Sequence, residues 1–407
     1  MPITRSAARA VPWLAAVVVV TGVGPLGTDT YLAAMPEMQR EPGHVERRRA
    51  LTLTAFIVGS ALGQIGAGPV SDARGRRPVL LVGTVAFTVL SLLSAFAPTG
   101  PTLVAIRLVQ GLVAGFGVAV GRACVSDVWH GPEAAQRFGT LASITFVAPV
   151  LAPALGGVVL AHGTWRLVFG GLALVGVLMV VAVLVGIPET LPPERRQAGG
   201  LAATGRRMAD LATDAPFMRH VVVQCLATAG FFVYIGGSSF VLQHVYGISE
   251  TTYSLVFASN AVAMVLVTVL FRLTVRRFGP ARLRATGVAV AATAATALLV
   301  HALTAPGGGS FAPTWVLLSV VTGAMGLSIP GTQALAQEAG ARSAGTASAL
   351  QGGLAFLVGA GSTPLTGLVG DRSLVPMAAL MCGLLLTSLV VLRVWRPVRQ
   401  PEAVAAP

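Results

Sequence analysis

The architecture of this chain can be worked out from one segment, Gly68-Pro69-Val70-Ser71-Asp72-Ala73-Arg74-Gly75-Arg76-Arg77-Pro78. The segment separates two apolar runs, at about 50–69 and 79–98. Each run is close to the ~20 residues with which an α-helix crosses the ~30 Å hydrocarbon layer of a membrane. The segment therefore predicts a tight turn between two membrane-spanning helices.

Glycine, proline and charge define the expected geometry of this turn. Gly68 lets two backbones pack closely, Gly75 can take a positive φ, and Pro78 suits the first turn of a helix. Asp72 is expected to face the arginines of the turn, Arg74, Arg76 and Arg77. Membrane topology accounts for the arginines alone. The complete pattern resembles the signature loop between helices 2 and 3 of the major facilitator superfamily, the secondary transporters built from two six-helix halves.

The composition indicates a membrane protein throughout. Of 407 residues, 54% are hydrophobic and 11% are charged, and the mean hydropathy is +0.78. A soluble domain has roughly 25% charged residues. The net charge of +13 comes from arginines in short clusters, without a basic face that interleaves with aromatics, and the three cysteines lack metal or disulfide spacing. We expect the lipid bilayer as a partner, but no nucleic acid, metal or cofactor.

The apolar runs divide into two sets of six. They lie near 11–34, 50–69, 79–98, 102–123, 138–161 and 166–187, and then near 220–243, 252–273, 285–304, 314–336, 345–368 and 374–395. The sequence predicts an all-α polytopic membrane protein of twelve transmembrane helices with a central cavity between its halves. The expected parts are an N-terminal half at 1–191, a cytoplasmic linker at 192–219 and a C-terminal half at 220–407.

The arginines also predict the orientation. With the amino terminus inside, the inner segments hold twenty arginines and the outer segments hold six. Cytoplasmic loops carry the excess of positive charge. Both termini are therefore expected in the cytoplasm, in a bacterial cytoplasmic membrane.

The second half contains a weak echo of the organising turn at Arg272-Leu273-Thr274-Val275-Arg276-Arg277-Phe278-Gly279-Pro280. Its position between the second and third spans of that half is what an internal repeat produces. The echo contains no aspartate, so the second half is expected to lack an equivalent of Asp72.

Asp29 is the only acidic residue that is predicted well inside a span. A carboxylate there is expensive, and desolvation favours its neutral form. Such a group can bind a proton from one side of the membrane and release it to the other. The alternative is a fixed charge that pairs with an arginine or caps a broken helix. We favour the proton carrier.

Arg107 lies several residues inside the fourth predicted span. Gln110 follows one turn later, and Gly111 permits close helix contact. Asp29 and Arg107 both fall in the outer half of the membrane, so we expect a direct or water-mediated pair for which substrate or a proton competes. The alternative is that Arg107 snorkels to the outer surface. At the inner end of the same span, Arg122 and Asp127 are expected to pair along one face and to brace or gate the protein.

The fifth predicted span contains Ala148-Pro149-Val150-Leu151-Ala152-Pro153-Ala154-Leu155-Gly156-Gly157. Pro149 and Pro153 bend the helix, and the small residues let it press on a neighbour. The segment resembles the antiporter signature of the superfamily's exporters, with Pro153, Gly156 and Gly157 on its fixed positions and Ala152 in place of the usual glycine. Kinked packing alone would produce a similar composition.

Further motifs are similar to those of the Bcr/CflA-type drug-resistance transporters, which include bicyclomycin and chloramphenicol exporters. They are Thr28-Asp29-Thr30-Tyr31-Leu32 with Pro36, Trp165-Arg166 with Phe169, the run 188–196, Phe240-Val241-Leu242-Gln243 with Tyr246-Gly247, and the run 344–350. Thr30 and Ala33 stand where that family tends to have Met and Pro. The resemblance covers nearly the whole chain and implies proton-driven export of amphipathic drugs by alternating access.

Polar and aromatic residues within the spans are candidates to line the substrate cavity, because amides and rings grip amphipathic molecules without demanding one geometry. The same residues also serve as packing contacts between helices. The candidates are Tyr31, Gln64, Gln110, Phe231, Phe232, Tyr234, Asn260, Gln333 and Gln351.

The leading hypothesis is a monomeric exporter that exchanges a small amphipathic substrate for protons, with the proton gradient as its energy source. A metabolite importer or facilitator on the same fold is the alternative. An integral membrane enzyme lacks support because His130 and Glu133 are isolated, without a catalytic cluster at either membrane face. A channel lacks support because the two halves contain no repeated filter sequence.

Overall fold

Long α-helices build this protein. The computed structural model describes residues 7–24, 26–28, 30, 46–197, 201–304, 310–369 and 373–395. The first half contains α1 (Ala7–Thr21), α3 (Glu46–Arg74), α4 (Arg76–Ala95), α5 (Gly100–Val128), α6 (Gly131–Ala161) and α7 (Trp165–Gly186). The second half contains α9 (Ala215–Tyr246), α10 (Glu250–Phe278), α11 (Pro280–Thr304), α12 (Phe311–Ala339), α13 (Ala344–Val369) and α14 (Val375–Val394).

The helices coincide with the twelve predicted apolar runs, although the run at 11–34 is only partly covered by described residues. Counted over the described residues alone, nine helices are long and apolar enough to cross a membrane. The predicted linker contains the short helix η1 (Pro193–Arg195), α8 (Leu201–Thr213) and the start of α9, and η3 (Ala341–Ser343) precedes α13. The all-α, multi-pass fold is therefore confirmed.

Local sequence sets several helix boundaries. The side chain of Asp214 accepts a hydrogen bond from the backbone N–H of Phe217 at 2.8 Å, and Ser249 caps α10 in the same way. Such caps satisfy N–H groups that the first helical turn leaves unpaired. The turns between α3 and α4 and between α10 and α11 instead contain Gly75 at φ 97° and Gly279 at φ 76°. The positive φ predicted for Gly75 is confirmed, and the echo in the second half makes an equivalent turn.

Close glycine contacts set the packing of α3 against α5. A Cβ on Gly111 would overlap the backbone of Phe56, and a Cβ on Gly63 would overlap that of Leu112. Small residues of this kind let two helices approach until their backbones touch. The close contact predicted for Gly111 is therefore confirmed.

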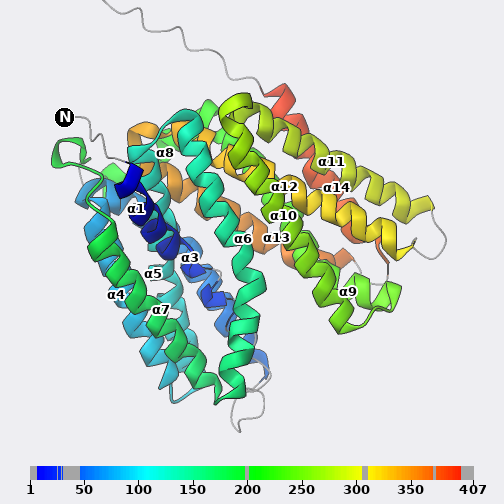
Figure 1. Cartoon of the computed structure of the whole chain (residues 1–407), viewed down its shortest axis with the longest axis horizontal. Helices are drawn as coiled ribbons and strands as arrows, with labels where there is room; N and C mark the ends of the chain where they lie inside the picture. The colour runs from blue at the N-terminus through cyan, green and yellow to red at the C-terminus, as the bar shows by residue number, and fades with distance from the viewer. Residues whose placement is uncertain are drawn as a thin grey trace, which may run out of the picture.

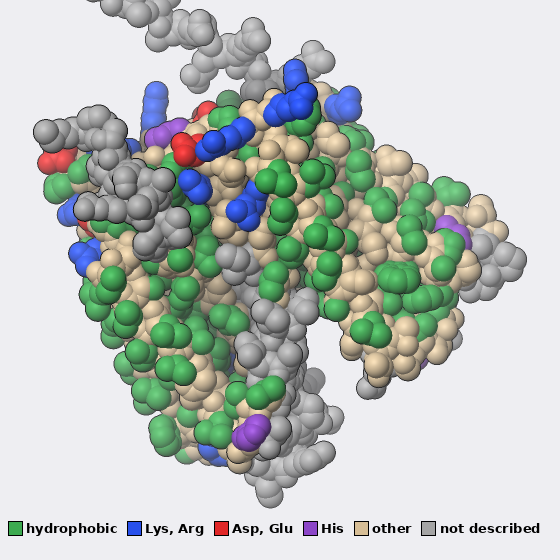
Figure 2. Space-filling view, viewed as in Figure 1, with side chains coloured by type: hydrophobic (Ala, Val, Ile, Leu, Met, Phe, Trp, Pro, Cys, Tyr) green, Lys and Arg blue, Asp and Glu red, His purple; other side chains and the backbone are tan. Residues whose placement is uncertain are grey.

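The two halves meet along α3 and α13, and along α6 with α10 and α12. Figure 1 shows them converging at the end of the bundle that carries α8 and diverging at the opposite end. We call these the linker end and the open end. Figure 2 shows arginines and acidic side chains gathered at the linker end, hydrophobic side chains over the rest of this face, and a notch between the halves at the open end.

Candidate functional site

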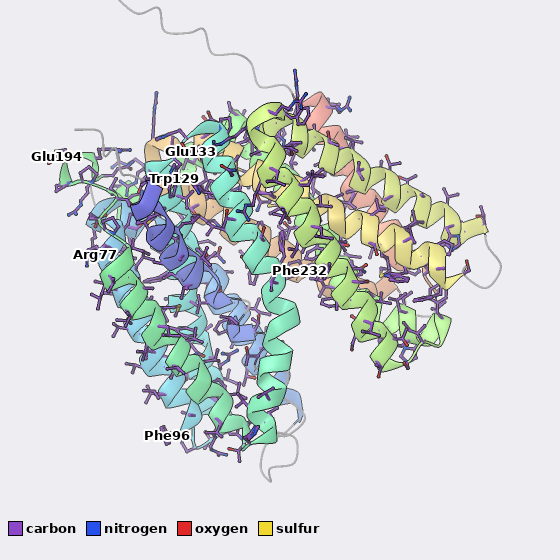
Figure 3. The ribbon with its side chains drawn as sticks, viewed as in Figure 1. Arg77, Phe96, Trp129, Glu133, Glu194 and Phe232 are labelled. Carbon is purple, nitrogen blue, oxygen red and sulfur yellow. The ribbon has the colours of Figure 1, made fainter. Side chains whose placement is uncertain are left out.

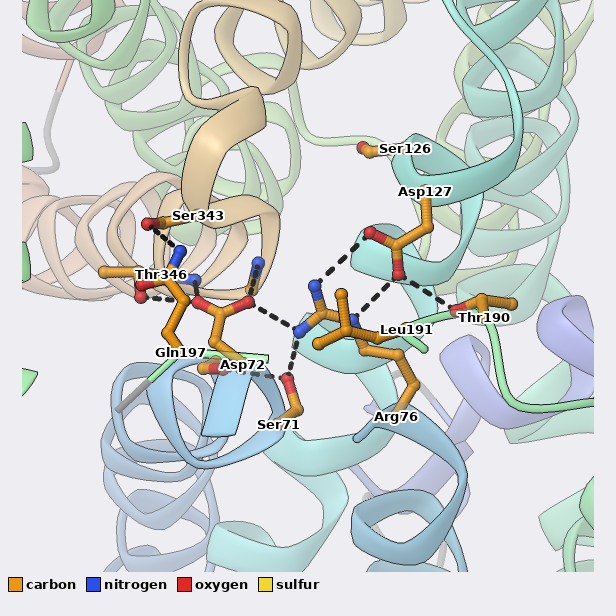
Figure 4. A network of polar contacts seen from close by, with 12 residues as sticks. Ser71, Asp72, Arg76, Ser126, Asp127, Thr190, Leu191, Gln197, Ser343 and Thr346 are labelled. Carbon is orange, nitrogen blue, oxygen red and sulfur yellow. Dashed lines mark hydrogen bonds and ion pairs between the residues drawn. The ribbon is translucent and has the colours of Figure 1, made fainter. Parts of the chain in front are cut away.

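Asp72 connects the two halves at the linker end. Its carboxylate accepts a hydrogen bond from Arg76 Nη1 at 2.7 Å on its own side, and from the backbone N–H groups of Gly345 at 3.0 Å and Thr346 at 2.8 Å on the other. The hydroxyl of Thr346 adds a fourth hydrogen bond at 2.7 Å. The N–H groups belong to the first turn of α13, where a helix carries partial positive charge. Asp72 therefore caps a helix of the opposite half (Figure 4).

Arg76 is the centre of this polar network and is only 1% exposed. Besides Asp72, its guanidinium contacts the carboxylate of Asp127 through Nε at 2.9 Å and Nη2 at 3.3 Å, and it donates to Ser71 Oγ at 2.7 Å. A buried cation needs such compensation, because removal of one partner from a buried pair costs about 3–5 kcal/mol. Arg76 thus joins α3, α4 and α5 into one charged layer (Figure 4).

The segment that leads into the predicted linker closes over the same layer. Glu189 accepts hydrogen bonds from the backbone N–H of Arg76 at 2.9 Å and of Leu191 at 3.0 Å, and Thr190 donates to Asp127 at 2.9 Å. Further along, the side chain of Gln197 donates to Ser343 Oγ of the second half at 2.7 Å. The segment 189–197 therefore connects the charged turn to both halves.

The arginines of the turn differ from their predicted arrangement. Asp72 was expected to face Arg74, Arg76 and Arg77, but it pairs with Arg76 alone among them. Arg74 is exposed, and Arg77 donates to the carbonyl oxygen of Leu184 at 2.9 Å. Arg76 is the arginine that turns inward because it begins α4 directly after Gly75 and faces both carboxylates.

The predicted pair of Arg122 and Asp127 is wrong. Residues five apart in an α-helix lie about 140° apart around its axis, so they do not share a face. Asp127 pairs with Arg76 instead. Arg122 faces α13, where a Cβ on Gly352 would overlap its guanidinium. The sequence offers one signal for Asp127 and Glu189. Both are acidic residues near predicted ends of spans on the same side of the membrane as the organising turn.

Gly68 allows the close approach of the halves that this network requires. A Cβ on Gly68 would overlap the carbonyl oxygen of Gly345 and lie 2.6 Å from the Cβ of Ala349. Glycine is therefore needed where α3 crosses α13. Further toward the edge of the interface, Arg276 of α10 lies 3.7 Å from Glu133 of α6, so the echo also contributes a contact between the halves.

Arg107 forms a second polar site inside the first half. It is fully buried, donates to Gln110 Oε1 at 2.8 Å and to the carbonyl oxygen of Gly27 at 2.8 Å, and its guanidinium lies 4.2 Å from the ring centroid of Phe56. Gln110 in turn donates to Ser91 Oγ at 2.7 Å. The burial of Arg107 contradicts the snorkelling alternative. Its side chain reaches the backbone two residues before Asp29.

Several predicted site residues cannot be placed in this network. Asp29 and Tyr31 lie outside the described residues. In α6, the backbone is helical through Pro149, Pro153 and Gly157, but their side-chain positions also lie outside the described part. Gly156 is buried. The roles predicted for these residues stay predictions.

Six of the nine predicted cavity residues are buried, and four of them, Gln110, Tyr234, Asn260 and Gln351, form side-chain hydrogen bonds. Gln351 donates to Gln224 Oε1 at 2.7 Å and lies 3.4 Å from Gln337, which contacts Ser126 of the first half at 3.2 Å. Asn260 donates to the hydroxyl of Tyr234 at 2.8 Å. Gln64 and Gln333 are buried as well. The layer formed by Gln224, Gln337 and Gln351, of which only Gln351 was predicted, lies next to the interface between the halves.

Phe231 and Phe232 are the predicted cavity residues that remain half-buried. Their rings are 6.4 Å apart, and Phe232 lies 6.1 Å from Phe356 of α13 in an edge-to-face arrangement. Figure 3 shows Phe232 about midway along the helices, far from Phe96 at the open end and from Glu133 at the linker end. The three rings form an aromatic cluster within the second half, and the cavity role predicted for Phe231 and Phe232 stays a prediction.

Comparisons with known sequences agree with this architecture. Residues 17–364 match the Major Facilitator Superfamily. YdgK of Bacillus subtilis, an uncharacterized MFS-type transporter, is 35% identical over 366 residues, which cover 88% of this chain and 89% of the relative. A bicyclomycin resistance protein homolog of Haemophilus influenzae is 26% identical over 83% of this chain and 84% of its own. Multidrug resistance protein MdtL of Escherichia coli is 27% identical over 58% of this chain and 60% of its own.

Solved structures share the fold. FucP, a transporter of the superfamily in the outward conformation, has a TM-score of 0.77 at 13% identity and covers 95% of this chain and 99% of its own. The human organic anion transporter MFSD10 has a TM-score of 0.73 at 19% identity and covers 94% of this chain and 99% of its own. Because the family match spans most of the sequence and the two-half helical fold agrees with it, the chain belongs to the Major Facilitator Superfamily and is a multi-pass membrane transporter.

Proposed function

We propose that this transporter exports small amphipathic compounds, such as antibiotics, in exchange for protons across a bacterial cytoplasmic membrane. The linker end and both termini face the cytoplasm, and the protein works as a monomer. The proton gradient supplies the energy without a cofactor.

The contact between Arg107 and the carbonyl oxygen of Gly27 carries this proposal. It brings a buried guanidinium to Gly27, which precedes Asp29 by two residues in the sequence, and Asp29 is the acidic residue predicted inside the membrane. A cation near a carboxylate favours its charged form, while desolvation favours its neutral form. Asp29 can then exchange its proton when the cavity changes sides.

The closed linker end supports transport by alternating access. In this conformation Asp72, the first turn of α13 and the linker hold the halves together at one end, while the other end is parted. A proton from the outer side neutralises Asp29, the halves rock, and Asp29 releases the proton to the cytoplasm as substrate loads. Proton and substrate therefore compete for one site.

The names of the relatives support the substrate class. A bicyclomycin resistance protein homolog and a multidrug resistance protein both align with this chain. The half-buried rings of Phe231 and Phe232 suit amphipathic molecules, which bind through apolar area with few fixed hydrogen bonds.

The test uses purified protein in liposomes that contain a pH-sensitive dye, with an imposed proton gradient and a panel of amphipathic antibiotics. The native chain is compared with Asp29→Asn and with Asp210→Asn, which changes an exposed carboxylate on α8. We expect substrate-dependent proton flux in the native chain and in Asp210→Asn. The flux should fall at least about a hundredfold in Asp29→Asn, because the amide cannot carry a proton.

Two other outcomes contradict parts of the proposal. Flux that persists in Asp29→Asn would move the proton site elsewhere. Absence of flux with every antibiotic, together with uptake of a metabolite, would make the protein an importer or facilitator.

A further inference from the structure

Three basic side chains meet at the linker end of the second half. Arg219 and His220 lie in the second turn of α9, and Arg284 lies near the start of α11. Arg284 Nη1 donates a hydrogen bond to Nδ1 of His220, and Arg219 Nη2 donates to the carbonyl oxygen of Leu392 in the last turn of α14. The guanidinium of Arg284 is nearly enclosed, since the residue is 4% exposed.

This cluster has no carboxylate among the described residues. The ion pairs found among the described residues are made by four arginines outside the cluster, Arg76, Arg137, Arg196 and Arg276. The buried Nε atoms of Arg219 and Arg284 also have no hydrogen-bond partner in the described structure. Two cations are therefore held close together with unused donors, which is costly unless an anion compensates them.

Two buried arginines of the first half have acceptor oxygens around their guanidinium groups. Arg76 contacts two carboxylates, and Arg107 donates to an amide oxygen and a backbone carbonyl. Arg284 instead donates to an imidazole nitrogen. Because Nδ1 of His220 accepts this hydrogen bond, the ring proton of neutral His220 lies on Nε2, where it adds one more donor to the cluster.

We propose that Arg219, His220 and Arg284 form a binding site for a phosphate group. Arginine presents a planar fork of N–H donors that matches phosphate oxygens, and basic pockets between transmembrane helices on the cytoplasmic side bind lipid headgroups. The phosphate comes from an anionic phospholipid or from free phosphate.

The surroundings of the cluster suit a headgroup at the membrane surface. The buried apolar side chains of Val223, Val288 and Leu392 form a packed group on the same three helices. Figure 1 shows α11 and α14 on the side of the second half that lies farther from the first half. The site therefore lies among α9, α11 and α14, and the hydrogen bonds of its three side chains stay within the second half.

The test measures lipid and phosphate binding to the full chain. Native mass spectrometry counts phosphatidylglycerol and phosphatidylcholine retained from mixed micelles, and thermal unfolding in neutral detergent compares inorganic phosphate with chloride at equal ionic strength. The double variant Arg219→Gln, Arg284→Gln is compared with Arg282→Gln, Arg393→Gln. The control removes the same charge from exposed arginines of α11 and α14.

We expect the native chain and the control to retain phosphatidylglycerol about tenfold or more over phosphatidylcholine, and the cluster variant to lose this preference. A phosphate-dependent rise in unfolding temperature without lipid preference, again absent from the cluster variant, would assign the site to free phosphate. The proposal is wrong if the native chain responds to neither probe, or if the cluster variant and control respond alike. If the cluster variant fails to fold, retention of phosphatidylglycerol by the native chain is measured at increasing concentrations of inorganic phosphate. Phosphate should displace the lipid, because both would occupy one site, and lipid retention that does not change would contradict the proposal.

Discussion

At the level of single residues, Asp72 does more than stabilise a turn. Its carboxylate accepts four hydrogen bonds, and three of them come from Gly345 and Thr346 of the other half. The side chain is almost completely buried, so these bonds face little competition from water. Each of the three contacts requires α3 and α13 to touch, so we expect Asp72 to stabilise the conformation in which the linker end is closed.

We therefore expect Asp72→Asn to open the linker end. The amide keeps the shape but loses the charge, and its N–H₂ group would face donors of α13. The loss is about 3 kcal/mol, which shifts the equilibrium between closed and open forms by roughly a hundredfold. Electron paramagnetic resonance distances between spin labels at the exposed positions Arg74 and Arg342, in a chain without native cysteines, measure this change.

The labelled parent chain and Asp210→Asn serve as controls for this experiment. Both should keep the short distance between the labels. An unchanged distance distribution in Asp72→Asn would mean that other contacts alone hold the linker end closed.

At the level of elements, the crossing of α3 and α13 is set by glycine. The carbonyl oxygen of Gly345 occupies the space that a Cβ of Gly68 would need. Two residues earlier on the same helix, Gly66 is exposed and has nothing within 4 Å of an added Cβ. Both positions are glycines of α3 at nearly the same depth in the membrane. They differ because Gly68 contacts the other half and Gly66 does not.

Gly68→Ala should therefore reduce transport at least about tenfold, because the linker end cannot close over the added methyl group. Gly66→Ala should transport like the native chain. Transport is measured in proteoliposomes and stability by thermal unfolding. Unfolding temperatures of the two variants should agree within a few degrees, since each half keeps its own core. Equal transport by both variants would show that this crossing does not limit the cycle.

At the level of the whole molecule, the hydrogen bonds and ion pairs that join the halves in the described part of the chain lie at the linker end. They include Asp72 with Thr346, Ser126 with Gln337, and Gln136 of α6 with the backbone of Arg272 at 3.2 Å. At the open end, Figure 2 shows the halves separated. A transporter that rocks about a central site must break this set of polar contacts in each cycle.

A covalent bond at the linker end should consequently stop transport. Ser126→Cys, Gln337→Cys in a background without the native cysteines places two thiols at positions whose native side chains lie 3.2 Å apart. Because cysteine is shorter than glutamine, a short, reducible thiol-reactive cross-linker joins them. Cross-linking should abolish transport, and reductant should restore it. Each single-cysteine variant is the control and should be insensitive to the cross-linker. Transport that continues after cross-linking would contradict rocking at this end.

Much of this architecture is local in origin and was predictable from the sequence. Twelve spans follow from runs of apolar residues, because hydrocarbon requires about 20 consecutive apolar residues in a helix. Gly75 predicts its own turn, since only glycine adopts positive φ without strain. The burial of Arg107 beside Gln110 also follows from local spacing, because residues three apart lie on neighbouring positions of one helix face.

The partners of the charged residues depended on the packing of helices that are distant in the sequence. Asp72 binds Gly345 across 273 residues, Asp127 binds Arg76 and not Arg122, and Arg284 meets His220 at the start of another helix. Hydropathy determines that a helix crosses the membrane, but it leaves the rotation and crossing of that helix open. Those two variables set which side chains face each other, and they are fixed only when close glycine contacts bring the helices together.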